Sequence, residues 1–367
     1  MNRSTWQLFR ESEPGMAVEK TLVEGKRDLG MKISYIVAES AGNVTLRSME
    51  YDPASLEPDQ VLLENEYSVI SAGTERAWIS GQANNPQQSF PYYPGYSASG
   101  RVLLTGSRVT SLKPGDRVLI TAGGHRSHTV KPADSVLKIT NDSIDLRDAA
   151  FAYIASFSML GVRNLRIEPG ESVMIAGLGI LGMIALQFAA LSGAVPLMVA
   201  DYDEVRLALA MELGADAAFH PGDADFVEQI RAFTDGAGVN AVVEVTGVAA
   251  ALKQALQYTA KRGRISLLGC TRVPDAPIDF YREVHLPGIA LIGAHTSNHA
   301  EGGSRPERWT ANDDYRTFLR FLANGKMKMR PLVSEMVSPA NAHEVYTRLI
   351  TMKNPPLGVM FDWQSIR

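Results

Sequence analysis

Apolar and polar positions alternate in short runs through the first part of the chain, beginning at Lys32. Alternation over four to eight residues is typical of half-buried β-strands, and Gly and Pro between such runs mark turns. The pattern therefore predicts a twisted, β-rich unit before about Asp148. Its strands are expected at 32–39, 43–50, 60–70, 98–106, 115–121 and 128–134.

The pattern changes near Asp148, where strand-like and helix-like stretches begin to alternate. This alternation implies βαβ units and a parallel sheet. Strands are expected at 171–177, 195–201, 240–247, 263–269 and 288–294, with helices at 181–194, 204–215 and 250–260. Two more helical patterns, at 313–325 and 341–352, precede a short strand at 357–363, and this tail is expected to rejoin the β-rich unit.

The length of 367 residues favours two domains, because one hydrophobic core seldom serves so long a chain. We predict a β-rich domain at 31–160 and 305–367, and an α/β domain with a parallel sheet at 161–304. Residues 1–30 carry charges of both signs and no apolar run that could act as a signal sequence. We interpret them as a loosely docked N-terminal extension.

The net charge and the cysteine count limit which partners and which cellular compartment we expect. The net charge is −4, from 36 basic and 40 acidic residues, so nothing favours nucleic acid or an anionic membrane as a partner. Cys270 is the only cysteine, which excludes an intrachain disulfide and fits a reducing compartment. We expect a cytoplasmic protein that acts on a small molecule.

A glycine-rich motif, GLGILG at 177–182, follows an apolar strand and opens an apolar helix. In a dinucleotide fingerprint, Gly177 permits the tight turn, Gly179 lets the backbone approach the pyrophosphate, and Gly182 lets the helix pack against the strand. The intervening residues would offer backbone N–H groups at the helix N-terminus. They are Leu178, Ile180 and Leu181.

Asp201 lies 19 residues past Gly182, at the end of the next expected strand. Its carboxylate should accept hydrogen bonds from the adenosine ribose and repel a 2′-phosphate, which favours NAD over NADP. Asp201 can also cap the following helix. Arg206 either lies over the adenine or is a solvated helix residue.

Three residues at later strand ends are candidate contacts for the nicotinamide half, or simply strand-end turns. They are Thr246, Gly247 and Gly269.

Five motifs together resemble the medium-chain dehydrogenase/reductase superfamily, from about Met31 to Trp363. They are GTE at 73–75, PGYSASGRV at 94–102, PGDRV at 114–118, the glycine loop, and MELGAD at 211–216. SAGTERAWISG followed by PYYPGYSASGRV is similar to a branch with bacteriochlorophyllide-dehydrogenase-like and sugar- or cyclitol-associated proteins. The resemblance implies an α/β fold, with a Rossmann-type doubly wound parallel sheet and a β-rich GroES-like catalytic domain. It also implies a homodimer or homotetramer, paired through GIALIGA at 288–294.

Zinc enzymes of this superfamily take ligands from three positions, which in this sequence are Ala72, Tyr96 and Tyr153. None of these residues is a usual zinc ligand. The structural-zinc lobe, with its four cysteines, cannot be built from one cysteine. We therefore predict that the chain binds no metal and works without zinc.

Without zinc, hydrogen-bond donors must stabilise the alkoxide that develops on the substrate, and a side chain must move the proton. Thr74 matches the superfamily's proton-relay hydroxyl. Tyr96 and Tyr153 either donate to the oxyanion or fill the volume that a metal site would occupy. Glu75 matches an acid that supports the metal in zinc relatives; here it either orients Tyr96 or Arg76, or forms a salt bridge.

Histidines are the other candidate proton carriers. His125 and His128 lie in GGHRSHTV, and His295 and His299 lie in GAHTSNH after an expected strand. Their spacing on loops is a weak metal pattern. We expect one or two of them to line the substrate pocket and the others to lie on the surface, and His295 is the candidate nearest the nicotinamide.

The leading hypothesis is NAD-dependent hydride transfer between a secondary alcohol and its ketone, with a polyol, sugar or cyclitol as substrate. One alternative is an NAD(P)H-dependent quinone or enone reductase, although Asp201 argues against NADPH. The other is an NAD-binding protein without catalysis.

Overall fold

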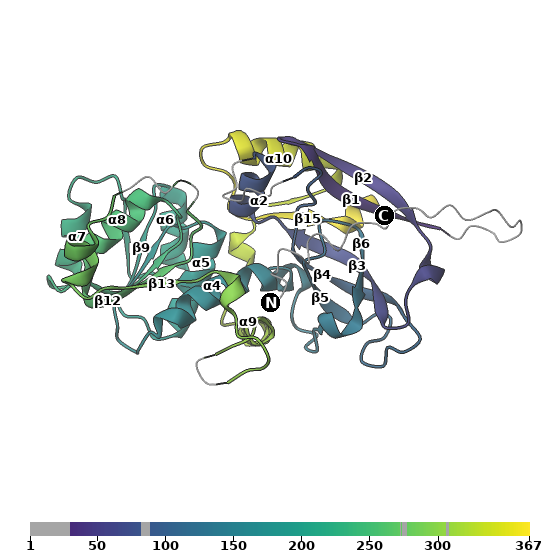
Figure 1. The fold of residues 1–367 in the computed structure, drawn as a ribbon, viewed down its shortest axis with the longest axis horizontal. Coiled ribbons are helices and arrows are strands. Elements are labelled where there is room, and N and C mark those ends of the chain that lie inside the picture. The colour runs from purple at the N-terminus through teal and green to yellow at the C-terminus, as the bar shows by residue number, and fades with distance from the viewer. Residues whose placement is uncertain (1–29, 82–88, 272, 274–276, 306–307) are drawn as a thin grey trace, which may run out of the picture.

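The computed structural model describes residues 30–81, 89–271, 273, 277–305 and 308–367. The expectation for the N-terminal extension falls, apart from Gly30, outside these residues. Two units lie side by side, one built on a parallel sheet with helices and the other β-rich (Figure 1). The fold class predicted from the sequence is therefore confirmed.

The parallel sheet has six strands. The chain adds two of them on one side of its first strand and then returns to add the other three on the opposite side. Their spatial order is β10 (Ala217–Phe219), β9 (Leu197–Ala200), β8 (Val173–Ala176), β11 (Val239–Glu244), β12 (Thr259–Leu267) and β13 (Ala290–Gly293). All neighbours in this order run parallel. Since β8 and β11 lie next to each other, the carboxyl ends of the strands form a crevice edge of the kind that binds nucleotides.

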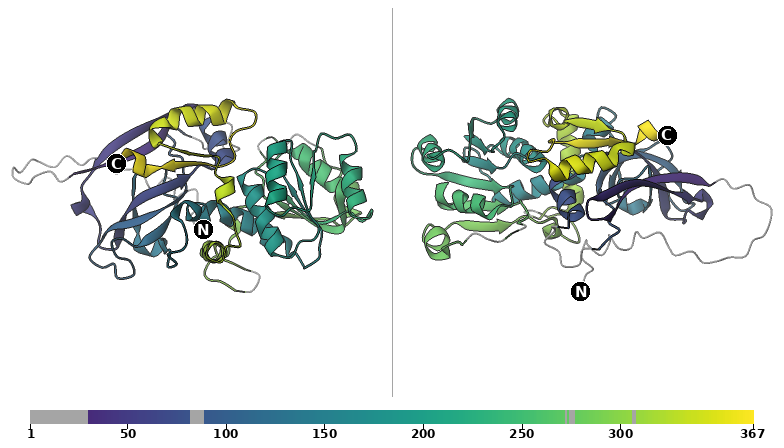
Figure 2. Two further views of the ribbon diagram at one scale, coloured as in Figure 1. Left: turned by 180° about the vertical axis from the view of Figure 1, so that it is seen from behind. Right: turned by 90° about the horizontal axis from the view of Figure 1, so that it is seen from above.

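Helices cover both faces of this sheet because its central strands are apolar on both sides. Val173 and Ile175 of β8 belong to one core cluster, whereas Met174 between them belongs to another. Figure 2 shows the helices above and below the strands. They are α5 (Ile180–Leu191), α6 (Glu204–Glu212), α7 (Phe226–Phe233) and α8 (Ala249–Tyr258).

The β-rich unit combines strands from both ends of the chain. Its larger sheet has the order β14 (Glu335–Val337), β15 (Val359–Asp362), β3 (Gln60–Val69), β4 (Ser97–Thr105), β5 (Arg117–Thr121) and β7 (Leu137–Lys138), with β6 (His128–Pro132) paired to β3. β1 (Met31–Ser40) and β2 (Asn43–Tyr51) form a separate antiparallel pair. The C-terminal strand β15 runs antiparallel to β3, so the tail returns to the first unit.

Two helices lie at the junction of the units, and two others cover the β-rich unit. α4 (Ala152–Leu165) packs against α5 and against α9 (Ala311–Ala323). α10 (Ala342–Thr351) packs against α2 (Ala72–Ile79) and β2. The remaining short helices are α3 (Leu146–Ala149), η1 (Pro53–Ser55), η2 (Ala133–Ser135), η3 (Phe280–His285), η4 (Thr296–Asn298), η5 (Arg330–Leu332), η6 (Pro339–Asn341) and η7 (Trp363–Ile366).

The structure differs from the sequence expectation at the end of α8 and at several elements that were not expected, among them α2, β10 and α7. β12 begins at Thr259, whereas the helical pattern was expected to continue to Ala260 and the strand to begin at Gly263. The Thr259 hydroxyl donates to the Ala255 carbonyl at 2.6 Å, which satisfies an orphan carbonyl at the end of α8. The expectation also omitted α4, because most of its side chains are buried and its sequence shows no polar face. In the described part of the chain, no helix is long and apolar enough to cross a membrane.

Candidate functional site

The glycine turn at 177–182 joins β8 to α5, and each of its glycines has a distinct geometric reason. Gly177 has a φ of +99°, and a Cβ there would lie 2.8 Å from the Thr246 methyl. A Cβ on Gly182 would lie 1.9 Å from the Gly177 carbonyl oxygen. A Cβ on Gly179 would meet no atom within 4 Å, so this glycine, the N-cap of α5, faces open space. These residues fit a dinucleotide, because an anion can approach the free N–H groups of α5 there.

Asp201 directly follows β9, and its carboxylate is hydrogen-bonded to the backbone of the glycine turn. Its Oδ2 accepts from the Leu178 N–H at 2.6 Å, and its Oδ1 accepts from the Asp203 N–H at 2.9 Å. A carboxylate has about four lone-pair positions, so both oxygens can still accept from ribose hydroxyls. Asp203, rather than Asp201, caps α6, through bonds from the Val205 and Arg206 N–H groups.

Arg206 lies on α6 with its guanidinium turned toward the C-terminal segment. Its Nη2 donates to the Pro355 carbonyl at 2.7 Å, and its Nε lies 3.9 Å from Asp203. This arrangement links the nucleotide unit to the β-rich unit. Whether the side chain also covers an adenine stays a prediction.

The ends of β11 and β12 pack closely around a buried carboxylate, Glu244. The N–H and hydroxyl of Thr246 donate to Glu244, as does the Gly247 N–H, while burial raises the pKa of Glu244. The Gly269 N–H donates to the Glu244 carbonyl at 2.8 Å. Any contact of these turns with a nicotinamide would therefore use their carbonyl oxygens, because their N–H groups already have partners.

The two tyrosines at predicted zinc-ligand positions come from distant segments and meet. The rings of Tyr96, just before β4, and Tyr153, on the first turn of α4, have centroids 5.1 Å apart. Phe157 and Tyr315 pack against them, from α4 and α9 respectively. Burial raises the pKa of Tyr96 and of Tyr153, so both phenols stay protonated at neutral pH.

The Tyr96 hydroxyl has no hydrogen-bond partner of good geometry within the described residues, although it is buried. It points toward the start of α2: burial and the Glu75 charge raise its pKa, while the hydroxyls of Ser71 and Thr74 lie near enough to lower it. A buried hydroxyl without a partner is costly, and such groups in native structures call for an explanation. A substrate oxygen would supply the missing acceptor.

Glu75 lies one turn into α2, fully buried, and accepts three hydrogen bonds. The Ser71 N–H donates to Oε1 at 2.9 Å. His125 Nε2 lies 3.2 Å from Oε2, which also accepts from the Tyr346 hydroxyl. Glu75 therefore pairs with His125 and Tyr346 rather than with Tyr96 or Arg76, although its charge adds to burial in raising the pKa of Tyr96.

His125 has a partner on each ring nitrogen. Ser68 Oγ accepts from Trp363 Nε1 at 2.9 Å and lies 2.7 Å from His125 Nδ1. His125 Nε2 faces Glu75 Oε2. Trp363, Ser68, His125 and Glu75 therefore form one buried chain of hydrogen bonds.

His125 also fixes the backbone before Tyr96. A Cβ on Gly95 would lie 2.6 Å from the imidazole, so only glycine fits beneath this ring. The His125 N–H donates to the Pro94 carbonyl at 2.7 Å, and the Ala122 N–H donates to the Tyr96 carbonyl at 2.9 Å. The expectation that the histidines line a pocket or lie on the surface missed this buried role.

The other histidines take different positions. His295 lies after β13 and caps η4, where its Nδ1 accepts from the Ser297 N–H, and burial lowers its pKa. His299 bonds the buried Asp314 through Nε2 at 3.0 Å. His128 is half-buried on β6 beside Ser127.

The described residues do not fit a zinc ion. Ala72 and the tyrosine rings occupy the positions of the superfamily's ligands, and no group of three or more His, Cys, Asp or Glu side chains gathers in the parts of the chain that the structure describes. Phenols that burial keeps protonated are poor metal ligands. We therefore derive no step through a metal.

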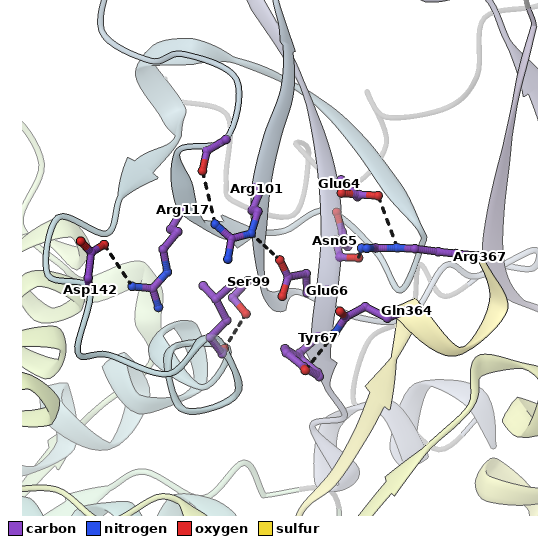
Figure 3. A network of polar contacts seen from close by, with 12 residues as sticks. Glu64, Asn65, Glu66, Tyr67, Ser99, Arg101, Arg117, Asp142, Gln364 and Arg367 are labelled. Atoms are coloured by element: carbon purple, nitrogen blue, oxygen red, sulfur yellow. Dashed lines mark hydrogen bonds and ion pairs between the residues drawn. The ribbon is translucent and has the colours of Figure 1, made fainter.

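A surface hollow of about 570 Å³ lies away from this site, between β3, β4 and the segment around Ile144. Figure 3 shows that its arginines already have partners: Arg101 bonds Glu66 at 2.8 Å, and Arg117 lies 3.7 Å from Asp142. Positive and negative side chains balance there, so the hollow offers no unpaired charge to a ligand.

Sequence reasoning missed several residues of the buried network, because their partners lie far away along the chain. Tyr346 and Trp363 belong to the C-terminal tail, yet they reach Glu75 and Ser68 near the start of α2. Only the expected return of the tail to the first unit hinted at these contacts.

Two known families match consecutive parts of the chain. Residues 57–141 match the family described as alcohol dehydrogenase GroES-like domain, and residues 181–323 match the family described as zinc-binding dehydrogenase. D-guloside 3-dehydrogenase of Shigella flexneri is 27% identical over 326 residues, which cover 82% of this chain and 92% of the relative.

Solved structures share the fold over nearly the whole chain. Galactitol-1-phosphate dehydrogenase from Escherichia coli has a TM-score of 0.77 at 19% identity, covering 90% of this chain and 99% of that one. A protein from Sinorhizobium meliloti 1021, provisionally named a zinc-binding dehydrogenase and solved with NADP bound, has a TM-score of 0.76 at 22% identity, with the same coverage.

Proposed function

The chain belongs to the medium-chain dehydrogenase/reductase superfamily, and we propose that it is a zinc-independent, NAD-dependent dehydrogenase that interconverts a secondary alcohol and its ketone. The observation that carries this proposal is the buried, unpartnered hydroxyl of Tyr96, which lies where zinc relatives place a metal ligand. A polyol, sugar or cyclitol is the proposed substrate class, and the named activities of the similar proteins support it.

The glycine turn and Asp201 would hold the cofactor. The N–H groups at the start of α5 bind the pyrophosphate, and the open side of Gly179 lets it approach. Asp201 accepts from the ribose hydroxyls and disfavours a 2′-phosphate, which supports NAD as the cofactor. Bound NAD would supply the hydride acceptor at its nicotinamide ring.

Tyr96 would hold the proton of the reacting oxygen. Because burial and the Glu75 charge both raise its pKa, Tyr96 stays protonated at neutral pH and can donate to the reacting oxygen. In ketone reduction, Tyr96 would give its phenol proton to the oxygen as hydride reaches the carbon, and Thr74 and Ser71 would pass a replacement proton from solvent to the phenol. Alcohol oxidation would follow the same path in reverse. Tyr153 packs beside Tyr96 and shapes the apolar wall of the site.

Glu75 and His125 would act as positioning residues. They would not reach the reacting atoms directly, but they fix α2, near whose start the Tyr96 hydroxyl lies, and the backbone at Gly95, next to Tyr96 in the chain. His295, next to the expected nicotinamide position, would line the substrate side. We also propose that subunits pair through β13, which lies at the edge of its sheet.

The test is turnover without metal. Protein purified in the presence of a chelator is titrated with NADH and with NADPH, and then assayed on polyols, sugars, cyclitols, ketones, enones and quinones. We expect NAD-dependent oxidation of a polyhydroxy substrate. Cofactor binding without turnover on any of these would favour a non-catalytic protein, and NADPH-dependent reduction of enones or quinones would favour a reductase.

Replacement of single hydroxyls tests the proton donor. Tyr96→Phe should lower kcat about 100-fold, equivalent to about 2.7 kcal/mol in the barrier, and change thermal stability little, because no hydrogen bond of good geometry to the described protein is lost. Tyr67→Phe is the matched control, since this tyrosine accepts a bond from Gln364 in the surface hollow. An unchanged kcat for Tyr96→Phe would remove Tyr96 from the mechanism.

A further inference from the structure

Two half-buried cations near the candidate active site lack a carboxylate partner within the described residues. The Arg126 Nε is buried without a hydrogen bond, and its guanidinium forms no hydrogen bond or ion pair with another described side chain. Among the described residues, Lys131 on β6 donates only to the carbonyl of Thr121. Burial without a counter-charge is costly for both groups.

Other arginines with a buried, unbonded Nε differ from Arg126 in this respect. Each of them has a carboxylate within 3.0 Å of its guanidinium. The pairs are Arg163 with Asp314, Arg264 with Glu171, and Arg348 with Glu335. The arginines of the surface hollow in Figure 3 are paired as well. Arg126 therefore differs from these arginines in having no acidic counter-charge among the described residues.

The two cations converge on one loop. The Arg126 guanidinium lies over Gly124, where an added Cβ would be 3.0 Å from Nη2. Lys131 reaches back to the carbonyl of Thr121, three residues earlier on the same loop. Burial, together with the nearby Arg126 charge, lowers the pKa of Lys131 to about 8. The two positive charges therefore lie close enough to repel each other.

Tyrosine rings border this pair of cations. Tyr35 on β1 pairs through its backbone with Arg126, and its ring lies 5.9 Å from that of Tyr93. Both phenols lie close enough to Arg126 to influence its pKa. An anion bound between the cations would thus have aromatic walls, and phenol hydroxyls at its edge.

We propose that Arg126 and Lys131 form an oxyanion-binding site that accepts a carboxylate or phosphate group. The planar fork of Arg126 suits two oxygens of such a group, and Lys131 adds a point charge. The bound anion would supply the counter-charge that the surrounding protein lacks.

The site lies on the same paired segments that position Tyr96. Residues 92–96 run beside residues 122–125, joined by the bonds from Gly124 N–H to the Gly95 carbonyl and from Ala122 N–H to the Tyr96 carbonyl. Arg126 is next to one end of this pair, and Tyr96 is at the other. Four peptide units between Ala122 and Arg126 span at most about 13 Å, the scale of a sugar acid or sugar phosphate. This link to the substrate rests on the proposed function.

Binding of inorganic phosphate to the full-length protein tests the site itself. Calorimetric titration is run with and without saturating NADH, so that phosphate bound at the glycine turn is recognised by its displacement. We expect binding that persists with NADH and weakens at least tenfold in Arg126→Gln and in Lys131→Met. Arg320→Gln, which removes an exposed charge on α9, is the matched control and should bind as the unaltered protein does. Equal binding by Arg126→Gln, with an unchanged circular dichroism spectrum, would overturn the proposal.

Kinetics with paired substrates identify the source of the anion. For sorbitol and sorbitol 6-phosphate, Arg126→Gln should raise KM at least tenfold for the phosphate alone if the substrate carries the group. If KM is unchanged while inorganic phosphate still binds in an Arg126-dependent way, the site serves a free anion. Because phosphate titration needs no turnover, failure of the proposed dehydrogenase activity would leave this result readable.

Discussion

Gly179→Ala separates cofactor binding from folding more cleanly than any other change in the glycine turn. The new methyl group would meet no protein atom within 4 Å, and the backbone at Gly179 (φ −66°, ψ −178°) is accessible to alanine. Alanine is a poorer N-cap than glycine by about 1 kcal/mol at most, and the smaller entropy of its unfolded chain offsets about 0.4–1 kcal/mol of that. The free energy of unfolding should therefore stay within about 1 kcal/mol of its original value.

Cofactor affinity should respond very differently. The methyl group would occupy the space through which a phosphate oxygen approaches the N–H groups of α5, where hydrogen bonds need about 2.7–3.1 Å. Loss of one bond to a charged group costs about 1.5–3 kcal/mol, which raises Kd about 10- to 150-fold. NADH and NADPH should weaken alike, because both carry the same pyrophosphate.

Fluorescence titration with both cofactors, beside a thermal melt, measures the two effects separately. Gly182→Ala is the informative comparison, because its Cβ would lie 1.9 Å from the Gly177 carbonyl and must disturb the fold. It should lower Tm as well as affinity. If Gly179→Ala kept both its Tm and its Kd for NADH, the reasoning that places a pyrophosphate at this turn would be refuted.

Three further predictions concern the cofactor, the metal and the anion site. Asp201→Ala should weaken NADH about tenfold more than NADPH, by loss of bonds to the ribose, and an unchanged ratio of the two Kd values would remove the NAD assignment. Metal analysis of the purified protein should find no stoichiometric zinc; one zinc per chain would overturn the proposed mechanism. Sulfate, whose charge is constant near neutrality, should bind Lys131 less well as the pH rises through about 8, because the ammonium group is protonated below its pKa and neutral above it. Calorimetry at about pH 7 and about pH 9 checks this, and an affinity independent of pH would contradict it.

Most of the fold could be predicted because its signals are local. The alternation at 60–70 and the apolar run around β8 identify strands from neighbouring residues alone, and the observed β3 and β8 match them. One exception is α4, where burial of most side chains removes the polar face that would reveal a helix. The short elements α2, β10 and α7 were not predicted either. Because Tyr153 lies on α4, the secondary structure of this candidate site residue was missed together with the helix.

The two halves of the candidate site differ in what the sequence can encode. Three glycines within six residues dictate a backbone path by themselves, so the turn at 177–182 was predicted together with the reason for each glycine. Glu75 has no such local constraint, since a carboxylate in a GTE motif can equally be exposed. Its surroundings depend on His125 and Tyr346, which are 50 and 271 residues away.

Contacts over such distances also determine the surroundings of Tyr96, which composition alone cannot give. Ser68 accepts from Trp363, near the end of the chain, and lies 2.7 Å from His125 Nδ1. His125 in turn contacts Glu75 through Nε2. Burial and the Glu75 charge together raise the pKa of Tyr96, so residues that lie far apart in the sequence determine whether this tyrosine can act as a donor.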